Sequence, residues 1–299
     1  MSETLNIKHK SLFNEILILI KYRLSLSVVI SSVASYLLAF EIFSPSTFIL
    51  LIIGGFLVVG SSNGFNQIIE RERDSLMSRT LNRPLPSGNM SIYQAIIICS
   101  IIGLVGLSML YAINFRTAFF GFVSMIIYLA VYTPLKPITP LSVFFGAIPG
   151  AIPFMLGWVA VTNKFSIETG ILFMIQFFWQ FPHFWAIGWF LHKDYQKAGF
   201  NMLPTGKRDK GTALQSIIYT AWTVLISIVP VFGFTGSLRL SILAAILVFV
   251  CGLLFLYYGL QLFKYQTEKA ARQLMLASVV YITSIQIIYV LDKFIRLWI

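Results

Sequence analysis

Long apolar runs dominate the chain, and short segments rich in Pro, Gly, Ser and basic residues separate them. Most of these runs are about 20 residues long, the length that an α-helix needs to cross the hydrocarbon core of a bilayer. They predict nine membrane-spanning helices, at residues 24–40, 47–69, 93–113, 117–133, 141–161, 169–191, 212–236, 240–263 and 273–291. We therefore expect an all-α, polytopic membrane helix bundle in which residues 1–299 form a single domain.

The composition supports this prediction and favours a lipid bilayer over nucleic acid as the partner. Hydrophobic residues make up 58% of the chain and charged residues only 11%. The mean hydropathy of +0.83 lies outside the range of water-soluble globular proteins. A net charge of +11 would suit nucleic acid, but the basic loops of a membrane protein carry the same charge. We therefore expect a lipid bilayer, and no nucleic acid, as the partner.

The basic residues also predict the orientation of the bundle. Most of the 22 Lys and Arg residues fall in the loops that lie on the same side as the N-terminus. Because cytoplasmic loops carry an excess of Lys and Arg, the N-terminus is predicted to be cytoplasmic and the C-terminus outside. Residues 1–20 lack the pattern of a cleavable signal, so a bacterial cytoplasmic (inner) membrane is the predicted location.

The two longest polar loops, residues 70–92 and 192–211, fall on the same predicted side and are separated by four spans. An even number of spans between similar loops is typical of two halves in parallel orientation. The layout thus predicts pseudo-halves at about 24–133 and 141–263, with the last helix added to them.

Candidate chemistry begins where the second predicted span meets its polar loop. If the helix continues through this segment, Asn66, Glu70 and Asp74 recur at i, i+4 and i+8 and share one face. Carboxylate and amide oxygens are suitable ligands for Mg²⁺, which takes further ligands from phosphates and water. The face therefore predicts a cation site at the membrane boundary, with Glu70 and Asp74 as metal ligands.

Basic residues accompany this face and predict an anion beside the cation. The residues are Arg71, Arg73, Arg79 and Arg83. An ordinary solvated loop of mixed charge would show the same residues. However, Asn63, Asn66 and Gln67 lie within the apolar span, where polar groups are costly and usually face the interior of a bundle.

A second polar cluster occurs in the sixth predicted span and its loop. Pro182 predicts a distortion of that helix, with Gln180 and His183 beside it. A hydrogen-bonded packing role is the alternative for an intramembrane His. Lys193 and Asp194 follow at the end of the span, so Asp194 can face Glu70 and Asp74 across a shared site.

The segment from Tyr132 to Lys136 ends the fourth span, and Lys136 is the only charge in its loop. We include both residues among the substrate-binding candidates. The small residues of the next span, such as Gly146, Gly150 and Gly157, are more typical of close helix packing than of catalysis.

With these residues identified, the chain resembles the UbiA-type intramembrane prenyltransferases, and within them the subgroup that farnesylates heme. The matching segments are 66–85, 132–136, 146–158, 179–184 and 193–204. They cover the chain from about 63 to 204, and the number and spacing of the spans extend the resemblance over nearly its whole length.

The resemblance implies a reaction. Farnesyl diphosphate, heme B and water would give heme O and diphosphate, with Mg²⁺ as cofactor and a heme A synthase as a further partner. Catalytic and metal-binding roles would fall on Asn66, Glu70, Asp74 and Asp194. Substrate-binding roles would fall on Arg71, Arg73, Arg79, Arg83, Tyr132, Lys136, Gln180, His183 and Lys193.

The chain departs from the family pattern at two places. The first motif is usually rich in Asp, whereas this chain has Gln67, Glu70 and Glu72. The second motif commonly has two Asp residues four apart, whereas Asp194 is followed at that distance by Ala198. The second departure weakens a mechanism with two metal ions.

Three other functions are compatible with parts of the pattern. A related enzyme would prenylate a quinone precursor or a chlorin, and an assembly factor for respiratory oxidases would have no activity. A transporter would also place polar residues in the membrane, but near its midplane. The clusters here lie at the ends of the spans, and this position favours the enzyme.

Overall fold

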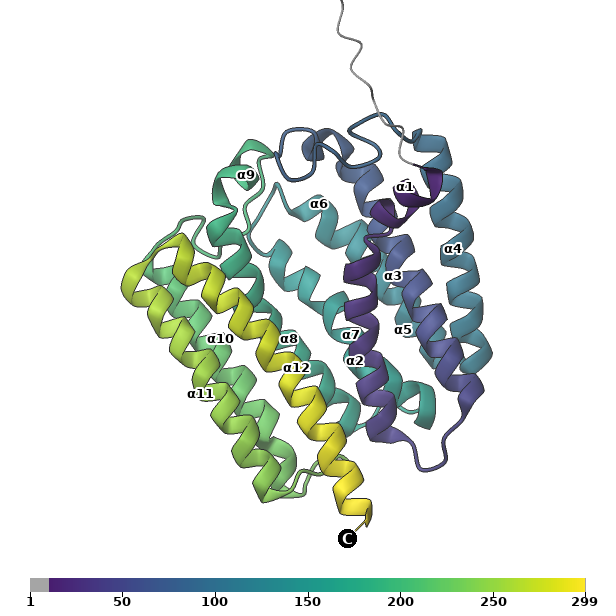
Figure 1. Cartoon of the computed structure of the whole chain (residues 1–299), viewed down its shortest axis with the longest axis vertical. Coiled ribbons are helices and arrows are strands. Elements are labelled where there is room, and N and C mark those ends of the chain that lie inside the picture. Colours follow the sequence, from purple (N-terminus) through teal and green to yellow (C-terminus); the bar gives the residue numbers. More distant parts are fainter. Residues whose placement is uncertain (1–10, 299) are drawn as a thin grey trace, which may run out of the picture.

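The computed structural model describes residues 11–298, and every regular element within them is a helix (Figure 1). The first half contains α1 (Leu12–Leu19), α2 (Tyr22–Ala39), α3 (Pro45–Asp74), α4 (Ile92–Ile113), α5 (Phe115–Ile126), the π-helix η1 (Ile127–Tyr132) and α6 (Thr133–Leu135). The second half contains α7 (Ser142–Thr162), α8 (Ile167–Phe190), α9 (His192–Lys197), α10 (Lys210–Ile228), the 3-10 helix η2 (Val229–Phe232), α11 (Ile242–Tyr265) and α12 (Glu268–Trp298).

The predicted class, an all-α membrane bundle, is confirmed. Within residues 11–298, eight helices are long and apolar enough to cross a membrane. The remaining predicted span, the sixth (169–191), corresponds to α8, which has 24 residues but does not reach the same hydropathy. Gln176, Gln180 and His183 lower it, and α8 nevertheless packs among the other long helices.

Local sequence explains where several helices begin. Ser44 accepts a hydrogen bond from the backbone N–H of Thr47 and precedes Pro45 at the first position of α3. Ser91 and Gln94 form a capping box at the start of α4. These caps satisfy N–H groups that have no partner within the helix.

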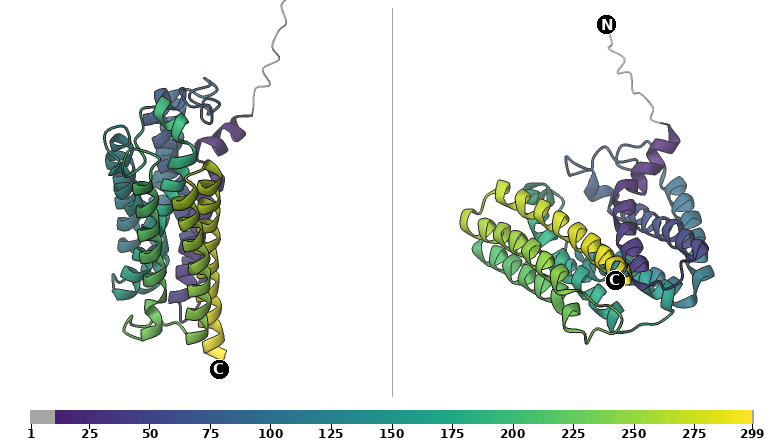
Figure 2. Two further views of the ribbon diagram at one scale, coloured as in Figure 1. Left: turned by 90° about the vertical axis from the view of Figure 1, so that its left-hand side faces the viewer. Right: turned by 60° about the horizontal axis from the view of Figure 1, so that its bottom comes forward.

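The long helices form two groups that stand side by side (Figures 1 and 2). One group contains α2, α3, α4, α5 and α7, and the other contains α8, α10, α11 and α12. They meet where α7 packs against α8 and where α12 packs against α2. The first and last long helices are therefore neighbours in space.

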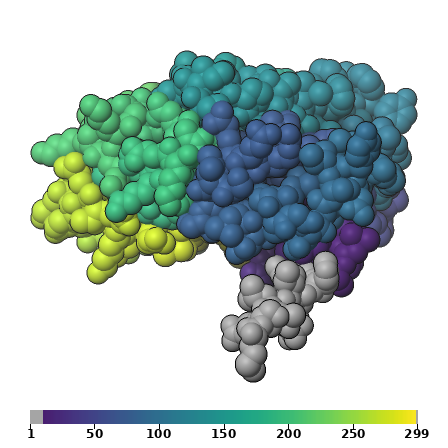
Figure 3. Space-filling view, turned by 90° about the horizontal axis from the view of Figure 1, so that it is seen from above, coloured from purple at the N-terminus to yellow at the C-terminus, as the bar shows by residue number. Residues whose placement is uncertain are grey.

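The polar elements gather at one end of the bundle, which we call the α1 end. It contains α1, α6, α9 and the segment 75–91 (Figure 1). Seen from this end, the segment after α3 and the segment after α8 are adjacent on the surface (Figure 3). Neither α1 nor η1 was predicted from the sequence.

Small residues in α7 permit close approach of α2. A Cβ added at Gly157 would lie only 2.0 Å from the carbonyl oxygen of Ser32, so a glycine is required at this crossing. Pro153 cannot donate to the carbonyl of Pro149, and the Ser124 hydroxyl donates to that carbonyl instead, at 3.2 Å. The packing interpretation of these small residues thus agrees with the structure.

Substitution of Gly157 by Ala should lower the thermal stability of the purified protein, because the methyl group forces α2 and α7 apart. We expect a loss of about 1–3 kcal/mol in the free energy of unfolding, measured by thermal denaturation in detergent. Gly170→Ala is the matched control, since a Cβ there meets nothing within 4 Å. Equal melting temperatures for the two variants would contradict the close-crossing argument.

Candidate functional site

A row of polar side chains follows the buried face of α3 to its last residue. It consists of Asn63, Asn66, Glu70 and Asp74, which are between 1% and 4% exposed, and we call it the polar row. As predicted, the helix continues through residue 74, so the spacing keeps these groups on one face. Buried polar groups of this kind require partners from other elements.

Two cations neutralise the carboxylates of the polar row. Nζ of Lys136 lies 2.7 Å from Oε1 of Glu70, and an Nη of Arg83 lies 2.6 Å from Oδ2 of Asp74. Burial lowers the pKa of Lys136, but Glu70 outweighs this effect and the pKa is raised overall. Lys136 therefore remains charged beside Glu70.

The π-helix η1 brings Lys136 to this position. The Thr133 hydroxyl donates to the carbonyl of Tyr128 and accepts from the side-chain amide of Asn66, which ties η1 to α3. The Lys136 ammonium lies over the rings of Tyr132 and Phe200, at 4.5 and 5.5 Å from their centroids. Cation–π contacts add to the ion pair in holding this ammonium. Single π-helical turns often occur at functional sites.

Lys21 is a further cation of the site that the sequence analysis did not single out. It connects α1 to α2 in a left-handed conformation, with φ of 47°, and its Nζ donates to Oδ1 of Asn66 at 3.2 Å. Gln67 fixes this connection by donating to the carbonyls of Ile18 and Leu19. Burial, together with the nearby charges of Arg83 and Lys136, lowers the pKa of Lys21 to about 7. The one sequence signal was its position between an apolar run and the first span.

Asp194, on α9, adjoins the site through the segment after α3. The Ser78 hydroxyl donates to both carboxylate oxygens of Asp194, at 2.9 and 3.1 Å, and this bond lowers the pKa of Asp194. Arg73 donates to the carbonyl of Ala198 and lies over the Phe200 ring. The two predicted polar clusters therefore meet at the α1 end.

Arg71, Arg79 and Lys193 form no ion pair with the polar row among residues 11–298. Arg71 donates to the carbonyl of Ile68 and pairs with the exposed Glu72. Arg79 and Lys193 are exposed, as expected for side chains in solvated loops.

Gln180 and His183, both on α8, form hydrogen bonds with α7 and α12 respectively and not with the polar row. The Gln180 amide donates to the carbonyls of Ala147 and Gln176, and a Cβ at Gly150 would lie 1.9 Å from its Oε1. Nδ1 of His183 lies 2.7 Å from the hydroxyl of Ser278 on α12. The α8 helix continues through Pro182 between them.

The donor atoms of the polar row fit a hard divalent cation. They are the amide oxygen of Asn66 and the carboxylates of Glu70 and Asp74, and Oδ1 of Asp74 has no hydrogen-bond partner among residues 11–298. No three His, Cys, Asp or Glu side chains in that part of the chain converge closely enough to hold a metal ion. A bound Mg²⁺ would therefore depend on oxygens of its substrate, and the joint role of Glu70, Asp74 and Asp194 stays a prediction.

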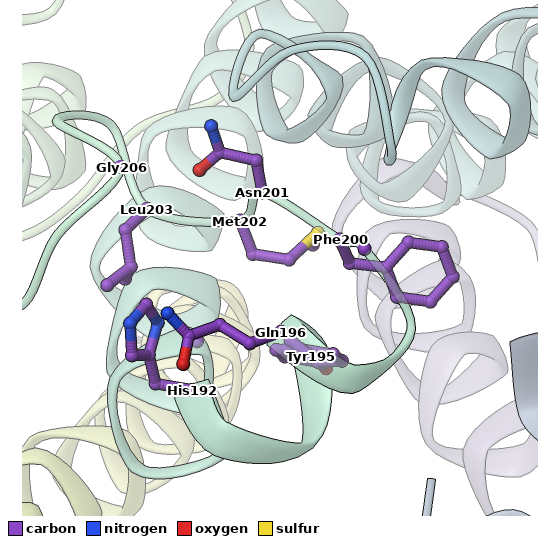
Figure 4. Close-up of a pocket in the computed structure, with 10 residues that line it drawn as sticks. His192, Tyr195, Gln196, Phe200, Asn201, Met202, Leu203 and Gly206 are labelled. Atoms are coloured by element: carbon purple, nitrogen blue, oxygen red, sulfur yellow. The ribbon is translucent and has the colours of Figure 1, made fainter. Parts of the chain in front are cut away.

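A cavity of about 230 Å³ lies between α9 and the segment 199–206 that follows it (Figure 4). His192, Tyr195, Gln196 and Asn201 contribute its polar groups. Burial and the nearby Arg208 lower the pKa of His192. No carboxylate lines this cavity, so it is distinct from the polar row.

Buried carboxylates matched by cations, at one end of a membrane bundle, are typical of a functional site within the membrane. The profile of the UbiA prenyltransferase family matches residues 28–285. The chain belongs to the UbiA prenyltransferase family, and it is a prenyltransferase.

Similar proteins indicate which subgroup of the family this chain resembles. Proteins named protoheme IX farnesyltransferase are 61% identical in Christiangramia forsetii, over 93% of both chains, and 57% identical in Flavobacterium psychrophilum, over 96% and 97%. The resemblance inferred from sequence motifs is thereby confirmed.

Solved structures share the fold at low sequence identity. A digeranylgeranylglyceryl phosphate synthase aligns with a TM-score of 0.77 at 20% identity, over 94% of this chain and 98% of that chain. A UbiA homolog from Archaeoglobus fulgidus, bound to DMAPP and Mg²⁺, aligns with a TM-score of 0.70 at 14% identity, over 92% and 99%.

Replacement of Lys136 by Met should destabilise the protein, because it leaves the Glu70 carboxylate buried without its counter-charge. The expected loss is about 3 kcal/mol, measured by thermal denaturation. The double variant Glu70→Gln/Lys136→Met should recover much of this loss. Lys197→Met, which removes an exposed ammonium 3.6 Å from Asp194, is the control and should have little effect. A melting temperature of Lys136→Met equal to that of the control would contradict the assignment.

Proposed function

We propose that this protein transfers the farnesyl group of farnesyl diphosphate to a vinyl group of protoheme IX, with addition of water, and releases heme O and diphosphate. The observation that carries the proposal is the polar row with its paired cations. The relatives named protoheme IX farnesyltransferase support the choice of donor and acceptor. The site is proposed to lie on the cytoplasmic side of a bacterial inner membrane, with a heme A synthase as a downstream partner.

The charges of the site match a metal diphosphate. The polar row has two carboxylates, whereas Lys21 in its protonated form, Arg83 and Lys136 provide three cations close to it. A prenyl diphosphate with one divalent cation keeps a net negative charge, so an excess of one cation is complementary to it.

Substrate binding can exchange partners within this site. As the diphosphate enters, Lys136 and Arg83 turn from their carboxylates to the diphosphate oxygens. Arg83 can bind phosphate as a bidentate donor, and Lys136 can bind it as a point charge. Glu70 and Asp74 are thereby released as ligands. The amide oxygen of Asn66, which accepts from Lys21, is released when Lys21 turns to the diphosphate in the same way. A Mg²⁺ held by them would polarise the diphosphate and stabilise the charge that develops on it.

The reaction then requires cleavage of the carbon–oxygen bond of the donor. The bonding electrons leave with the diphosphate, whose charge Lys21, Lys136 and Arg83 stabilise. The allylic cation meets the faces of Tyr128 and Tyr132, whose rings are 5.2 Å apart beside Lys136. The vinyl electrons form the new carbon–carbon bond, and the resulting cation adds water and loses a proton.

Glu70→Gln should reduce turnover by at least about a hundredfold, because it removes a charged ligand of the polar row. The assay contains purified protein, heme B, farnesyl diphosphate and Mg²⁺, and heme O is measured by chromatography with mass spectrometry. Glu72→Gln is the matched control, since Glu72 lies two residues away but is exposed and pairs with Arg71. A thermal melt of each variant separates loss of activity from loss of folding.

The same assay distinguishes the alternative acceptors. Formation of heme O by the wild-type protein supports the proposal. Prenylation of an aromatic quinone precursor or a chlorin in place of heme would keep the class of enzyme and exclude this acceptor. Absence of diphosphate release with every acceptor would contradict the proposed reaction.

The affinity for farnesyl diphosphate should decrease as pH rises from about 7 to about 9. The ammonium of Lys21 is lost above its lowered pKa of about 7, whereas a bound anion favours the charged form. Binding above pH 7 thus takes up a proton, and affinity falls by up to about tenfold per pH unit. Lys21→Arg keeps the charge and should remove most of this dependence. Parallel pH profiles for the two proteins would exclude Lys21 as the titrating group.

A further inference from the structure

His183 has a hydrogen-bond arrangement that determines which of its ring nitrogens carries the proton. Nδ1 lies 2.7 Å from the hydroxyl oxygen of Ser278, and that hydroxyl donates to the carbonyl of Met275 at 2.6 Å. A serine has only one hydroxyl proton, so Ser278 must accept from His183. Nδ1 is therefore protonated, and in the neutral ring the lone pair is on Nε2.

The other contacts of the imidazole fix its plane and leave Nε2 accessible. Its ring stacks on Trp179, with centroids 4.8 Å apart and an interplanar angle of 22°. The Trp179 indole N–H donates to the carbonyl of Ser278 at 2.6 Å, so one turn of α12 orients both rings. Nε2 forms no hydrogen bond with residues 11–298. It is also not one of the fully buried polar atoms of that part of the chain, so a ligand can reach it. His183 itself is partly exposed.

This arrangement is that of a metal-binding histidine. A ligating imidazole usually donates its second N–H to a neighbouring acceptor, which fixes the tautomer and the direction of the lone pair. His183 is two turns before the end of α8, about 10 Å along the helix axis, which places it within the apolar part of the bundle. Among residues 11–298 no carboxylate forms an ion pair with His183, so a simple ion pair does not account for the residue.

We propose that Nε2 of His183 is an axial ligand of the iron of the heme acceptor and that Ser278 is the positioning residue that presents it. The inference rests on the proposed function, since it takes heme as the acceptor. Coordination by His183 would hold the porphyrin against α8 and α12, in a fixed direction relative to the polar row. Ser278 acts through His183 and does not itself contact the heme iron.

The test uses heme B and the purified full-length protein in lipid nanodiscs, without farnesyl diphosphate. Resonance Raman spectra of the reduced complex report the iron–histidine stretch, whose frequency depends on the hydrogen bond made by Nδ1–H. The wild-type protein should show this band. His183→Ala should lose it, and added imidazole should restore it.

Variants of Ser278 separate positioning from packing. Ser278→Ala should retain the band at a lower frequency and bind heme about tenfold more weakly, whereas Ser278→Thr should resemble the wild type. Ser216→Ala is the matched control, because Ser216 is also fully buried and donates to a carbonyl of its own helix. An unshifted band in Ser278→Ala would overturn the positioning role, even if His183→Ala failed to fold.

The outcomes distinguish this inference from the proposed function. If the wild-type protein makes heme O while folded His183→Ala keeps the iron–histidine band, the ligand assignment fails and the reaction stands. If the wild-type protein prenylates only a different acceptor and does not bind heme, the proposed function and this inference fail together.

Discussion

The structure depends on one electrostatic constraint: two carboxylates lie inside a bundle of apolar helices and must have counter-charges there. An unpaired buried carboxylate costs several kcal/mol even after the surroundings relax. Glu70 obtains Lys136 from the segment after η1, and Asp74 obtains Arg83 from the segment after α3. The elements of the α1 end are thus arranged around α3, and the same charges that satisfy its carboxylates are those that an anionic substrate requires.

This arrangement also explains why the site is assembled from distant parts of the chain. The side-chain oxygen of Asn66 accepts a hydrogen bond from Lys21, and its side-chain N–H donates to the hydroxyl of Thr133. Arg73 donates to the carbonyl of Ala198. Each contact satisfies a polar group that lipid cannot solvate. The result is a site whose charged groups are already gathered in one place before any substrate arrives, so that substrate binding requires only an exchange of partners among them.

The parts that followed from sequence were those encoded by local periodicity. Uninterrupted apolar runs predicted the long helices, and the spacing of Asn66, Glu70 and Asp74 predicted their common face because α3 does continue through them. The pairing of Lys136 with Glu70 was not predictable, because it depends on the tertiary position of η1. Lys21 was counted only as one of many basic loop residues, and Ser278 has no local feature that separates it from a packing serine. Both acquire their roles from contacts with helices far away in sequence.

The contact between the first and last long helices has a consequence for biogenesis. Gln286 donates to the hydroxyl of Ser31, and Lys293 donates to the carbonyls of Leu37 and Phe40 at the end of α2. These partners are separated by more than 250 residues, so α2 leaves the ribosome long before α12 is synthesised. During that interval the bundle is incomplete, because α2 does not yet have α12 as a neighbour. Insertion of α12 completes the bundle. A chain truncated before α12 would leave the Ser31 hydroxyl and the carbonyls of Leu37 and Phe40 without these partners in the membrane.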